Sequence, residues 1–463
     1  MKAFFSGTLQ AALCSLLITS QVAFAQAQSL AFPEAKGFGR YTQGGYGGQI
    51  YVVDSLADNA QNPAKGSLRY AVEQKGPRIV VFNVSGVIHL QAPLKFNNPY
   101  ITIAGQTSPG GIVISGNTTG ISTDQVIIRY LRFRLGSSVA DEDAITARNT
   151  RDVIIDHCSF SWGVDETATF YNNYNFTLQN SIISESLNNA GHAKGEHGYG
   201  GIWGGAGASF INNVIAHHTS RLPRINGHRL KPTYPQSDSY AELINNVIYN
   251  WQDKSTYGGE NGRFNLIGNY YKQGPAGGAK RIFEFFPVKV GDNKTQAFIA
   301  ENYFDQQIKL TQDNSKALKF PKGTTQTEIQ SVLQNKPVVP NQQAELAYYQ
   351  DAVSAKAAFQ TLIYQKEVGA NRNQSGFYLD SVDERVLAEI KLGQANKGKN
   401  GIIDTELDSI TSWANYQQDF SQFKAYPDTN QDGISDLWMA KFADKLNQNQ
   451  PAIQQYINTL GAF

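Results

Sequence analysis

Cysteine is scarce in this chain, with 2 among 463 residues. Cys14 lies in an amino-terminal segment with the features of an export signal, so Cys158 is the one cysteine expected in the processed chain. A single cysteine excludes an intramolecular disulfide, and a cysteine among apolar residues most often packs in a core. The fold is therefore expected to hold together without disulfides.

Net charge is also nearly absent, because 40 Lys and Arg balance 39 Asp and Glu to leave a formal charge of +1. No global field therefore recruits a nucleic acid or a membrane surface, and we expect neither as a partner. Recognition of an acidic partner would have to be local. Long apolar runs are lacking as well, yet hydrophobic residues make up 41% of the chain, which is enough for a large core.

The amino terminus predicts an export signal in residues 1–25. Lys2 precedes a short apolar run, Ala11–Ile18, and the small residues Ala23 and Ala25 form a cleavage pattern. The run is too short to span a bilayer. A lipoprotein anchor at Cys14 is the alternative, but the bulky Leu13 before it disfavours that reading. We expect cleavage after Ala25 and a secreted or periplasmic protein.

Seven short apolar segments share one template of strand-forming residues, and turn-rich sequence separates them. Their starting points differ by 27, 23, 32, 33, 23 and 33 residues. The segments are Ile127–Phe133, Ile154–Phe160, Thr177–Ile183, Ser209–Ile215, Glu242–Ile248, Asn265–Tyr271 and Phe298–Phe304. A period of this length indicates a solenoid, and Val, Ile, Phe, Tyr and Thr favour stacked strands over stacked helices.

An asparagine recurs with the repeat, at steps of 33, 33, 23 and 33 residues. The positions are Asn180, Asn213, Asn246, Asn269 and Asn302. An inward asparagine at a bend can hydrogen-bond the backbone of its own turn and stack on the next asparagine. The alternative is a set of unrelated turn dipeptides in a β-sandwich. The shared phase favours an all-β fold: a right-handed single-stranded parallel β-helix with long loops and a helical C-terminal extension.

The chain is expected to divide into four parts. After the signal, residues 26–310 form the β-helix, and the helical segment Gly66–Ala71 could cap its open amino-terminal end. Residues 311–425 form an extension that packs on the β-helix, with helical character in Gln343–Gly369. Residues 426–463 form a tail with a short helix at Ala452–Leu460. A monomer is expected.

Two acidic clusters lie about one turn of the solenoid apart. Asp141 and Asp143 are spaced to project from one face of a strand. Asp165 and Glu166 follow 22 or so residues later, so that these carboxylates can converge. Carboxylates this close repel one another unless a hard cation such as calcium lies between them. A solvated acidic loop is the alternative.

Two basic or imidazole-containing segments follow. Arg221–Arg224 reads RLPR, and positive groups beside a cation site suit a polyanionic ligand. The loop from His192 to His197 continues into a glycine-rich run, whose backbone can approach a ligand closely. Both histidines could be metal ligands. The alternatives are an ordinary basic turn and an ordinary polar loop.

Six motifs in order resemble the polysaccharide lyase family of pectate lyases, and with the repeats they span about residues 32 to 302. They are Phe32–Arg40 (FPEAKGFGR), Gly66–Arg69 (GSLR), Ile103–Pro109 (IAGQTSP), Asp141–Ile145 (DEDAI), Ile155–Ser161 (IDHCSFS) and Arg221–Arg224 (RLPR). The resemblance implies a parallel β-helix enzyme that cleaves polygalacturonate by β-elimination, with calcium between protein carboxylates and the uronate.

The resemblance also implies roles for particular residues. Asp141, Asp143 and Asp165 correspond to calcium ligands, and Arg221 corresponds to the base that takes the C5 proton. Lys194 is the candidate for the family's lysine that holds the substrate carboxylate, and His192 is a further substrate-binding candidate.

Two positions depart from the family pattern. Ser161 stands where the family often has a glutamate ligand, and Glu166 is the candidate replacement. Asn226 stands where a second arginine is common, and Arg224 and Arg229 are both candidate replacements. The departures concern the calcium site and a substrate subsite more than the reaction class.

The chemistry is physically reasonable, since the C5 proton lies α to a carboxylate whose developing charge calcium and cationic groups stabilise. The base is the difficulty. Arginine in proteins keeps its proton up to about pH 12, so that only concentrated positive charge nearby would favour the neutral form. An arginine base is therefore expected from the resemblance alone.

A second calcium motif lies near the carboxyl end. Asp428, Asn430, Asp432 and Asp436 occupy positions 1, 3, 5 and 9 of an EF-hand-like loop, with Gly433 at position 6. Met439 replaces the glutamate of position 12, so the loop is not a full EF-hand. A structural calcium is expected here, and an acidic turn is the alternative.

The leading hypothesis is thus a calcium-dependent pectate lyase acting on polygalacturonate. A polygalacturonase-type hydrolase on the same fold would need paired aspartates in a pattern that the sequence lacks. A non-catalytic polysaccharide-binding β-helix is the other alternative, which Ser161 and Asn226 keep open and Arg221 disfavours. Pectin lyase, which works without calcium, is disfavoured by the acidic clusters.

Overall fold

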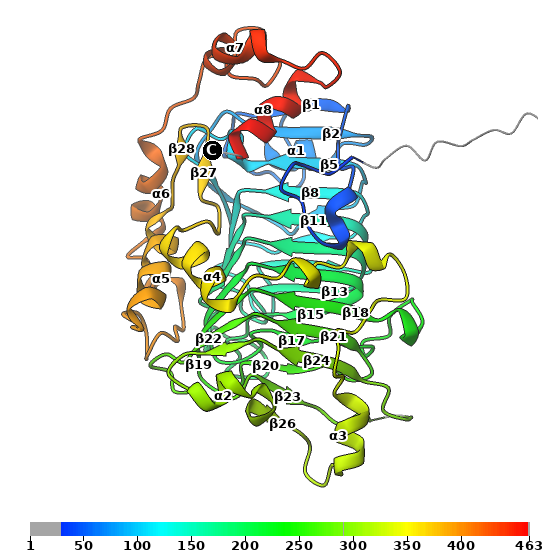
Figure 1. Ribbon diagram of the computed structural model, residues 1–463. Coiled ribbons are helices and arrows are strands. Elements are labelled where there is room, and N and C mark those ends of the chain that lie inside the picture. The colour runs from blue at the N-terminus through cyan, green and yellow to red at the C-terminus, as the bar shows by residue number, and fades with distance from the viewer. Residues whose placement is uncertain (1–28, 290, 462–463) are drawn as a thin grey trace, which may run out of the picture.

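The computed structural model describes residues 29–289 and 291–461, in which the chain winds into stacked turns of parallel strands (Figure 1). Most turns contribute one strand to each of three parallel sheets. The first sheet contains β4 (Leu94–Phe96), β7 (Thr119–Ile121), β10 (Ile145–Arg148), β13 (Ala168–Gln179), β15 (Ile202–Ile211), β17 (Arg224–Ile225), β20 (Thr256–Gly258), β23 (Phe283–Phe285) and β26 (Leu318–Lys319).

The second sheet shares two strands with the first, because β13 and β15 are long enough to run through both. Its other members are β1 (Gln49–Val53), β2 (Arg78–Phe82), β5 (Ile101–Ala104), β8 (Val126–Arg129), β11 (Arg151–Asp156), β18 (Tyr240–Ile244), β21 (Arg263–Ile267) and β24 (Gln296–Ala300). A register shift between Phe170 and Asn173 marks the place where β13 passes from one sheet to the other.

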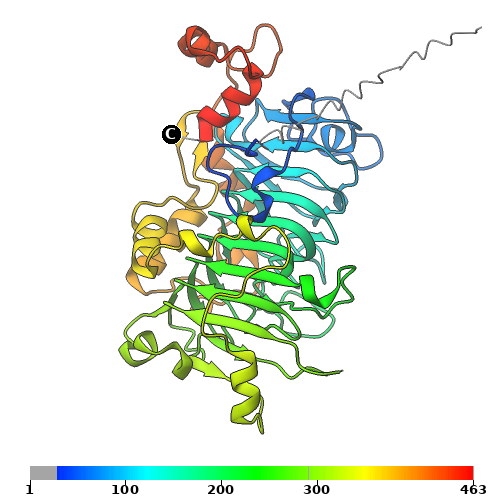
Figure 2. The same ribbon diagram turned by 45° about the vertical axis from the view of Figure 1, so that its right-hand side comes forward.

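The third sheet closes the coil. It contains β3 (Gly86–His89), β6 (Ile112–Ser115), β9 (Leu131–Arg134), β12 (Ser159–Ser161), β14 (Ile182–Ser184), β16 (Val214–His218), β19 (Val247–Trp251), β22 (Tyr270–Lys272) and β25 (Tyr303–Phe304). The right-handed parallel β-helix predicted from the repeats is confirmed, as is the helical extension. Figure 2 shows the same stack of turns from a second side.

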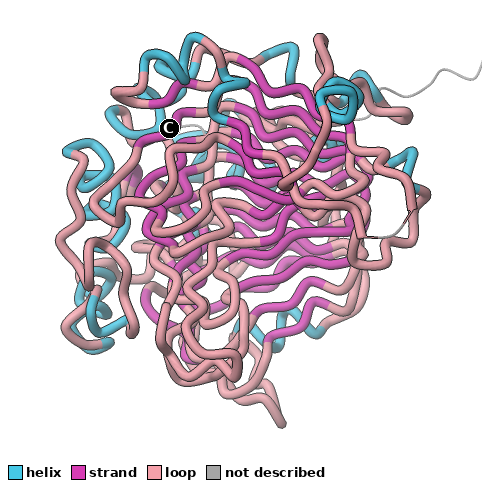
Figure 3. Tube along the Cα trace, turned by 90° about the horizontal axis from the view of Figure 1, so that it is seen from below, coloured by secondary structure: helices cyan, strands magenta, loops and turns pink. Residues whose placement is uncertain are grey.

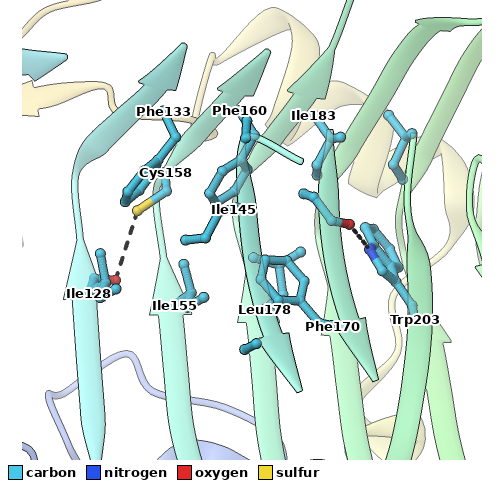
Figure 4. Close-up of a cluster of buried hydrophobic side chains, with 14 of the residues drawn as sticks. Ile128, Phe133, Ile145, Ile155, Cys158, Phe160, Phe170, Leu178, Ile183 and Trp203 are labelled. Carbon is cyan, nitrogen blue, oxygen red and sulfur yellow. Dashed lines mark hydrogen bonds between the residues drawn. The ribbon is translucent and has the colours of Figure 1, made fainter. Parts of the chain in front are cut away.

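The core fills the inside of the coil with apolar side chains that stack from turn to turn (Figure 4). The rings of Phe133 and Phe160, one turn apart, stack with centroids 5.5 Å apart. Cys158 is buried in this core and its thiol points to the carbonyl of Ile128, so the packing role expected for it is confirmed. Each fully buried side chain of this size contributes roughly 1.5–3 kcal/mol to stability.

The asparagine ladder exists, with one change of membership. Asn213, Asn246, Asn269 and Asn302 each accept a hydrogen bond from the backbone N–H one turn earlier, at 2.9–3.0 Å. The strand register, however, aligns Ser181 and not Asn180 with Asn213. Asn180 occupies the bend position one residue earlier with a positive φ, and donates to Asp156. The prediction for Asn180 was therefore wrong by one residue, since the turn before Asn213 is 32 residues long in register and not 33.

The extension covers the outer face of the third sheet. Helices α4 (Ala355–Phe359) and α5 (Ser381–Leu392) pack on apolar side chains of β14, β16, β19 and β22. Beneath α5, Arg134 in β9 is fully buried and paired with Asp380 and Asp383. The strand stack continues past residue 310, because β26 pairs with β23 at the end of the coil.

The tail covers the outer face of the second sheet. Ile434, Trp438 and Tyr456 pack with Ile79 and Val81 of β2. The remaining helices are α1 (Leu68–Glu73), α2 (Ile308–Gln312), α3 (Gln326–Val332), α6 (Trp413–Ser421), α7 (Asp436–Phe442) and α8 (Ala452–Gly461). Viewed from below, the helices lie around the margin of the strand stack (Figure 3).

The ends of the coil agree with the sequence in part. Helix α1 buries Leu68 and Val72 at the amino-terminal end of the core, as expected of a cap, and Ser67 caps the helix itself. The predicted helical character of Gln343–Gly369 is broken into short turns around α4.

The predicted signal peptide lies outside the described residues. None of the helices in the described part of the chain is long and apolar enough to cross a membrane.

Candidate active site

The candidate site lies where four successive turns enter the first sheet. Asp143 precedes β10, Glu166 precedes β13, Tyr199 precedes β15 and Arg221 precedes β17. Isolated bridges pair Glu166 with Tyr199 and Tyr199 with Ser220, so these turns are stacked in register. Residues that are far apart in the sequence therefore form one row along the coil.

Three carboxylates converge at one end of this row. Asp143, Asp165 and Glu166 each offer an oxygen within 4.8 Å of the other two. The Glu166 N–H also donates to Asp143 Oδ1 at 2.9 Å, which fixes the two turns together. The side chains of Asp143 and Glu166 are each 3% exposed, whereas that of Asp165 is 29% exposed. Buried carboxylate oxygens with one solvent-facing member suit calcium.

The pKa values of the acidic residues in the cluster also favour a bound cation. Burial raises the pKa of Asp143 to about 7, with the nearby Asp165 carboxylate adding to the rise and Arg148 opposing it. Arg148 Nη2 lies 3.0 Å from Asp143 Oδ2 but its side chain is 43% exposed, so its compensation is incomplete. Burial also raises the pKa of the adjacent Glu142, and the Asp143 charge contributes. Glu166 is paired with Arg221, so that Asp143 and Asp165 are the carboxylates whose charge a divalent cation would compensate further.

Asp141 lies apart from the three converging carboxylates. Its side chain is 48% exposed, and its Oδ1 accepts a hydrogen bond of 2.8 Å from the backbone N–H of Ala193. His192 Nδ1 lies 3.3 Å from the same oxygen. Asp141 thus holds the loop around residue 192 in the structure, while Glu166 completes the cluster.

Arg221 reaches back along the row to the carboxylates. Its guanidinium contacts the Glu166 carboxylate and lies over the ring of Tyr199, 4.1 Å from the centroid. The Arg221 side chain is 22% exposed, so that one side faces the cleft described next. A cation–π contact on one face and an ion pair at the tip hold the group in place.

A basic cleft of about 790 Å³ opens beside Arg221. Arg221, Arg224, His228, Arg229 and Lys289 line it together with Glu260. Glu260 pairs with Arg224 and Glu166 with Arg221, which leaves Arg229 and Lys289 as the excess positive charge. Burial, and next the positive charge of Arg224, lower the pKa of Arg229. The cleft is therefore suited to an extended anion.

Two aromatic rings pack against Arg224, and one of them, Phe286, lines the cleft. The Arg224 guanidinium lies 5.1 Å from the centroid of Tyr257 and 4.9 Å from that of Phe286. The strand register explains this arrangement, because Arg224 in β17 pairs directly with Tyr257 in β20. Both candidate replacements for the family's second arginine, Arg224 and Arg229, thus lie in the cleft.

The residues at the two departures from the family pattern take no part in the cleft. Ser161 is fully buried in β12 of the third sheet and bonds to Arg134 and Ser184. Asn226 is fully buried and donates to the side chain of Asn172 at 3.0 Å. Both side chains are therefore part of the buried scaffold.

The loop from His192 to His197 folds over the acidic end of the row. His192 and His197 are buried and stack with ring centroids 3.6 Å apart, and each has a nitrogen within 3.5 Å of Asp165 Oδ1. Lys194 is exposed and does not line the cleft. Burial, and next the charge of His192, lower the pKa of His197.

The EF-hand-like loop lies against the outer face of the second sheet, and its residues do not line the cleft. Asp428 accepts hydrogen bonds from the N–H groups of Asp432 and Gly433, at 3.1 and 2.9 Å. Asp436 accepts from Thr429. Gly433 has a φ of 80°, and a Cβ there would approach Ile50 to 2.8 Å. Glycine is required at this position for both reasons.

Several site residues had no signal in the sequence. Glu260, Tyr257 and Phe286 come from turns with no motif of their own, Tyr199 lies unnoticed in the glycine-rich run, and Arg148 follows Asp143 by five residues. Tyr257 could have been identified only from the strand register, because it pairs with Arg224 in the neighbouring strand.

Comparison with known proteins bears on the family. No family model matches the chain. "Probable pectate lyase C" of Aspergillus flavus is 32% identical over 418 residues, which cover 88% of this chain and 86% of that protein. The protein of the same name from Aspergillus oryzae gives the same identity and coverage. The crystal structure of Jun a 1, the major allergen from cedar pollen, superposes with a TM-score of 0.50 at 19% identity, over 72% of this chain and 92% of that one, which shows the shared fold.

Proposed function

The chain belongs to the pectate lyase family of polysaccharide lyases, and on that premise we propose that it cleaves polygalacturonate by calcium-assisted β-elimination. The products would be oligogalacturonides with a 4,5-unsaturated end. The observation that carries this proposal is the position of Arg221, which joins the three-carboxylate cluster to the basic cleft.

The cleft supports a polyanionic substrate. Arg224 and Arg229 present guanidinium groups to it, and such groups bind carboxylates through paired, planar hydrogen bonds. Phe286 lines the cleft next to Arg224 and offers an apolar ring, which suits a sugar ring bearing a carboxylate. We assign substrate binding to Arg224 and Arg229 on this ground.

The carboxylates Asp143, Asp165 and Glu166 fit a calcium ion, because they provide hard oxygen ligands that are otherwise undercompensated. Calcium held there would neutralise the uronate carboxylate and stabilise the charge that develops beside it. Asp141 would join as a ligand only by leaving the N–H of Ala193.

Arg221 is the proposed base. After losing a proton to water, neutral Arg221 would take the C5 proton of the uronate, the C5–H electron pair would become the C4–C5 double bond, and the C4–O bond would break. The leaving oxygen would take its proton from water. Glu166 holds the guanidinium in the structure, so that Glu166 must turn away before Arg221 can face the substrate. Tyr199 keeps the guanidinium plane in position during that change.

His192 and Lys194 are assigned secondary places in this proposal. His192 lies between Asp141 and Asp165 and would position the latter. Lys194 is exposed on the same loop, where it could contact a substrate that extends beyond the cleft. We also propose that Asp428, Asn430, Asp432 and Asp436 hold a structural calcium in the tail. Export directed by residues 1–25 would bring the enzyme to its polymer.

The test is the ultraviolet absorbance of polygalacturonate incubated with the purified protein, with calcium or with chelator. Absorbance that rises only with calcium, and is lost in Arg221→Ala, supports elimination, since the conjugated unsaturated uronide comes from a lyase reaction. Arg281→Ala, a change of the same kind outside the cleft, serves as the matched control. New reducing ends without absorbance would mean a hydrolase, and neither signal would mean a binding protein.

A further inference from the structure

We propose that the substrate-binding surface continues from the basic cleft across Tyr171 to Arg148, and that Arg148 binds the carboxylate of a further uronate. The inference rests on the proposed function and extends it. The ligand is then a run of several unesterified uronates, which lies along the outer face of the first sheet toward the amino-terminal turns of the coil.

Arg148 and Tyr171 both belong to the outer face of the first sheet. In β10, Ile145 and Ala147 are buried in the core while Arg148 is exposed, as the alternation of side chains along a strand requires. Arg148 pairs in register with the partly buried Tyr171 of the neighbouring strand β13. The Arg148 guanidinium lies 5.2 Å from the centroid of the Tyr171 ring, which holds it over the sheet.

The same arrangement occurs a second time on this face, inside the cleft. Arg224 of β17 pairs in register with Tyr257 of β20, and its guanidinium lies 5.1 Å from that ring. Arg224 is the residue to which the proposed function assigns a uronate carboxylate. The pair formed by Arg148 and Tyr171 therefore presents the same groups, in the same orientation to the sheet, at an earlier turn of the coil.

Hydrogen bonds connect the two places. Asn172, the residue after Tyr171, donates through Nδ2 to the carbonyl of Leu230 at 2.9 Å. Its Oδ1 accepts from Asn226 at 3.0 Å. These bonds hold the segment containing Arg229, which lines the cleft, against the turn that follows Tyr171. An extended ligand can thus pass from Arg229 across Tyr171 without leaving the protein surface.

The present partner of Arg148 is a carboxylate that the proposed function assigns to calcium. Arg148 Nη2 donates to Asp143 Oδ2 at 3.0 Å, and this is its one ion pair within the described ranges. Calcium on Asp143 would compensate that carboxylate and repel the guanidinium, so that Arg148 would turn to an anionic ligand. The neighbouring Glu142 feels the positive charge of Lys95 as well as that of Arg148, so it keeps a cation nearby.

The chemistry of the group selects a free uronate. A guanidinium binds a carboxylate through two parallel hydrogen bonds, whereas a methyl ester offers it no charge. The Arg148 side chain is 43% exposed, so that it can reorient without opening the core. The subsite therefore adds affinity for stretches of consecutive unesterified uronates and adds none for a ligand that ends at the cleft.

The experiment compares the Kd values of hexagalacturonate and digalacturonate by calorimetry at saturating calcium, with Arg221→Ala in every protein so that neither ligand is cleaved. Three strand spacings, roughly 14 Å, separate β10 from β17, which a hexamer spans and a dimer does not. Arg148→Gln should weaken hexagalacturonate binding at least about tenfold and leave digalacturonate binding unchanged. Arg151→Gln is the matched control, because Arg151 also lies over a tyrosine, Tyr174, but belongs to the second sheet.

Two results would overturn the subsite. One is equal hexagalacturonate affinity in Arg148→Gln and Arg151→Gln. The other is an equal loss for both ligands in Arg148→Gln, because Arg148 would then act only as the partner of Asp143. Thermal unfolding checks that each variant is folded. The expected change in the ratio of the two Kd values, in a protein whose wild type produces no unsaturated uronide, would refute the proposed function and leave the subsite standing. Lyase activity with an unchanged ratio would refute the subsite alone.

Discussion

The guanidinium of Arg221 contacts the carboxylate of Glu166 across two turns of the β-helix, with Tyr199 on the turn between them. One carboxylate thus belongs both to the converging acidic cluster and to the proposed base. In the absence of a cation, Glu166 compensates Arg221. Under the proposed function, a bound cation would give Glu166 another partner and leave Arg221 free to face the cleft. Cation binding and release of the base would then be coupled through this one side chain.

The first prediction concerns that coupling. Glu166→Gln should weaken calcium affinity by about 10- to 100-fold, because the site loses one of three charged ligands. At saturating calcium the maximal rate should fall little or not at all, since the ion pair that holds Arg221 back from the substrate is removed. Calcium titration of the lyase rate measures both effects. Glu142→Gln is the control, because Glu142 is next to Asp143 but outside the converging cluster. Unchanged calcium affinity in Glu166→Gln would contradict the assignment.

The second prediction concerns the cleft. Arg224→Lys should raise KM for polygalacturonate roughly tenfold, since the loss of a charge-assisted hydrogen bond costs about 1.5 kcal/mol. The change in kcat should be smaller, because Arg224 pairs with Glu260 and lines the cleft beside the proposed base instead of acting as the base itself. Steady-state kinetics at saturating calcium measure this split. Arg281→Lys is the matched control. Arg281 pairs with Glu284 outside the cleft, so this variant should leave both KM and kcat unchanged. An effect on kcat alone would place Arg224 in the chemical step.

The third prediction concerns pH and stability. Burial lowers the pKa of His218 to about 3, from an ordinary value of 6.5. The folded state then binds fewer protons than the unfolded state between these values, so stability falls as pH drops below 6.5. At pH 5 the His218 contribution to the free energy of unfolding should be lower by about 2 kcal/mol than at pH 7.

Urea unfolding at pH 7 and pH 5 measures this effect, with His218→Gln as the reference. The reference should lose about 2 kcal/mol less between the two pH values than the wild type does. Comparing the two chains removes other titrating groups, such as Glu242, whose pKa burial raises to about 7 and which acts in the opposite direction. Equal losses in both chains would show that His218 is not buried as a neutral group.

The fourth prediction concerns the asparagine ladder. Asn246 accepts from the N–H of Asn213 at 2.9 Å and donates to the carbonyl of Phe210 at 3.0 Å. Asn246→Ala leaves both buried groups without a partner, and should lower the free energy of unfolding by about 2–5 kcal/mol. Denaturant unfolding gives the value. Asn59→Ala, in an exposed turn, should cost less than about 1 kcal/mol. Similar costs for the two variants would argue against the ladder.

The fifth prediction concerns the tail. Calcium should slow amide hydrogen exchange in residues 426–461, by up to about 2.7 kcal/mol of protection at 100 times its Kd. Asp432→Asn should abolish that effect, while lyase activity remains calcium-dependent. Asp444→Asn, an exposed acidic residue outside the loop, should behave as the wild type. Calcium protection that persists in Asp432→Asn would mean that the loop is an acidic turn.

The amino-acid sequence by itself determined the class of fold and the family. The repeat fixes the coil because each apolar strand can bury its face only against the next turn. Buried amides at the bends require side-chain partners, which is why asparagine recurs with the strands. The order of the motifs resembles that of pectate lyases, and this resemblance pointed to Arg221 and the acidic clusters as candidate site residues.

Only the tertiary structure decided which residues meet. The sequence could not show that Asp141 holds a loop while Glu166 joins Asp143, because both acidic pairs lie in turns whose backbone direction depends on neighbouring turns. The one-residue shift from Asn180 to Ser181 depends on the strand register, which the core sets and local sequence does not. Tyr199 and Glu260 lie in the site because the coil stacks turns of unequal length. Contacts between such turns are set by packing, which no local pattern encodes.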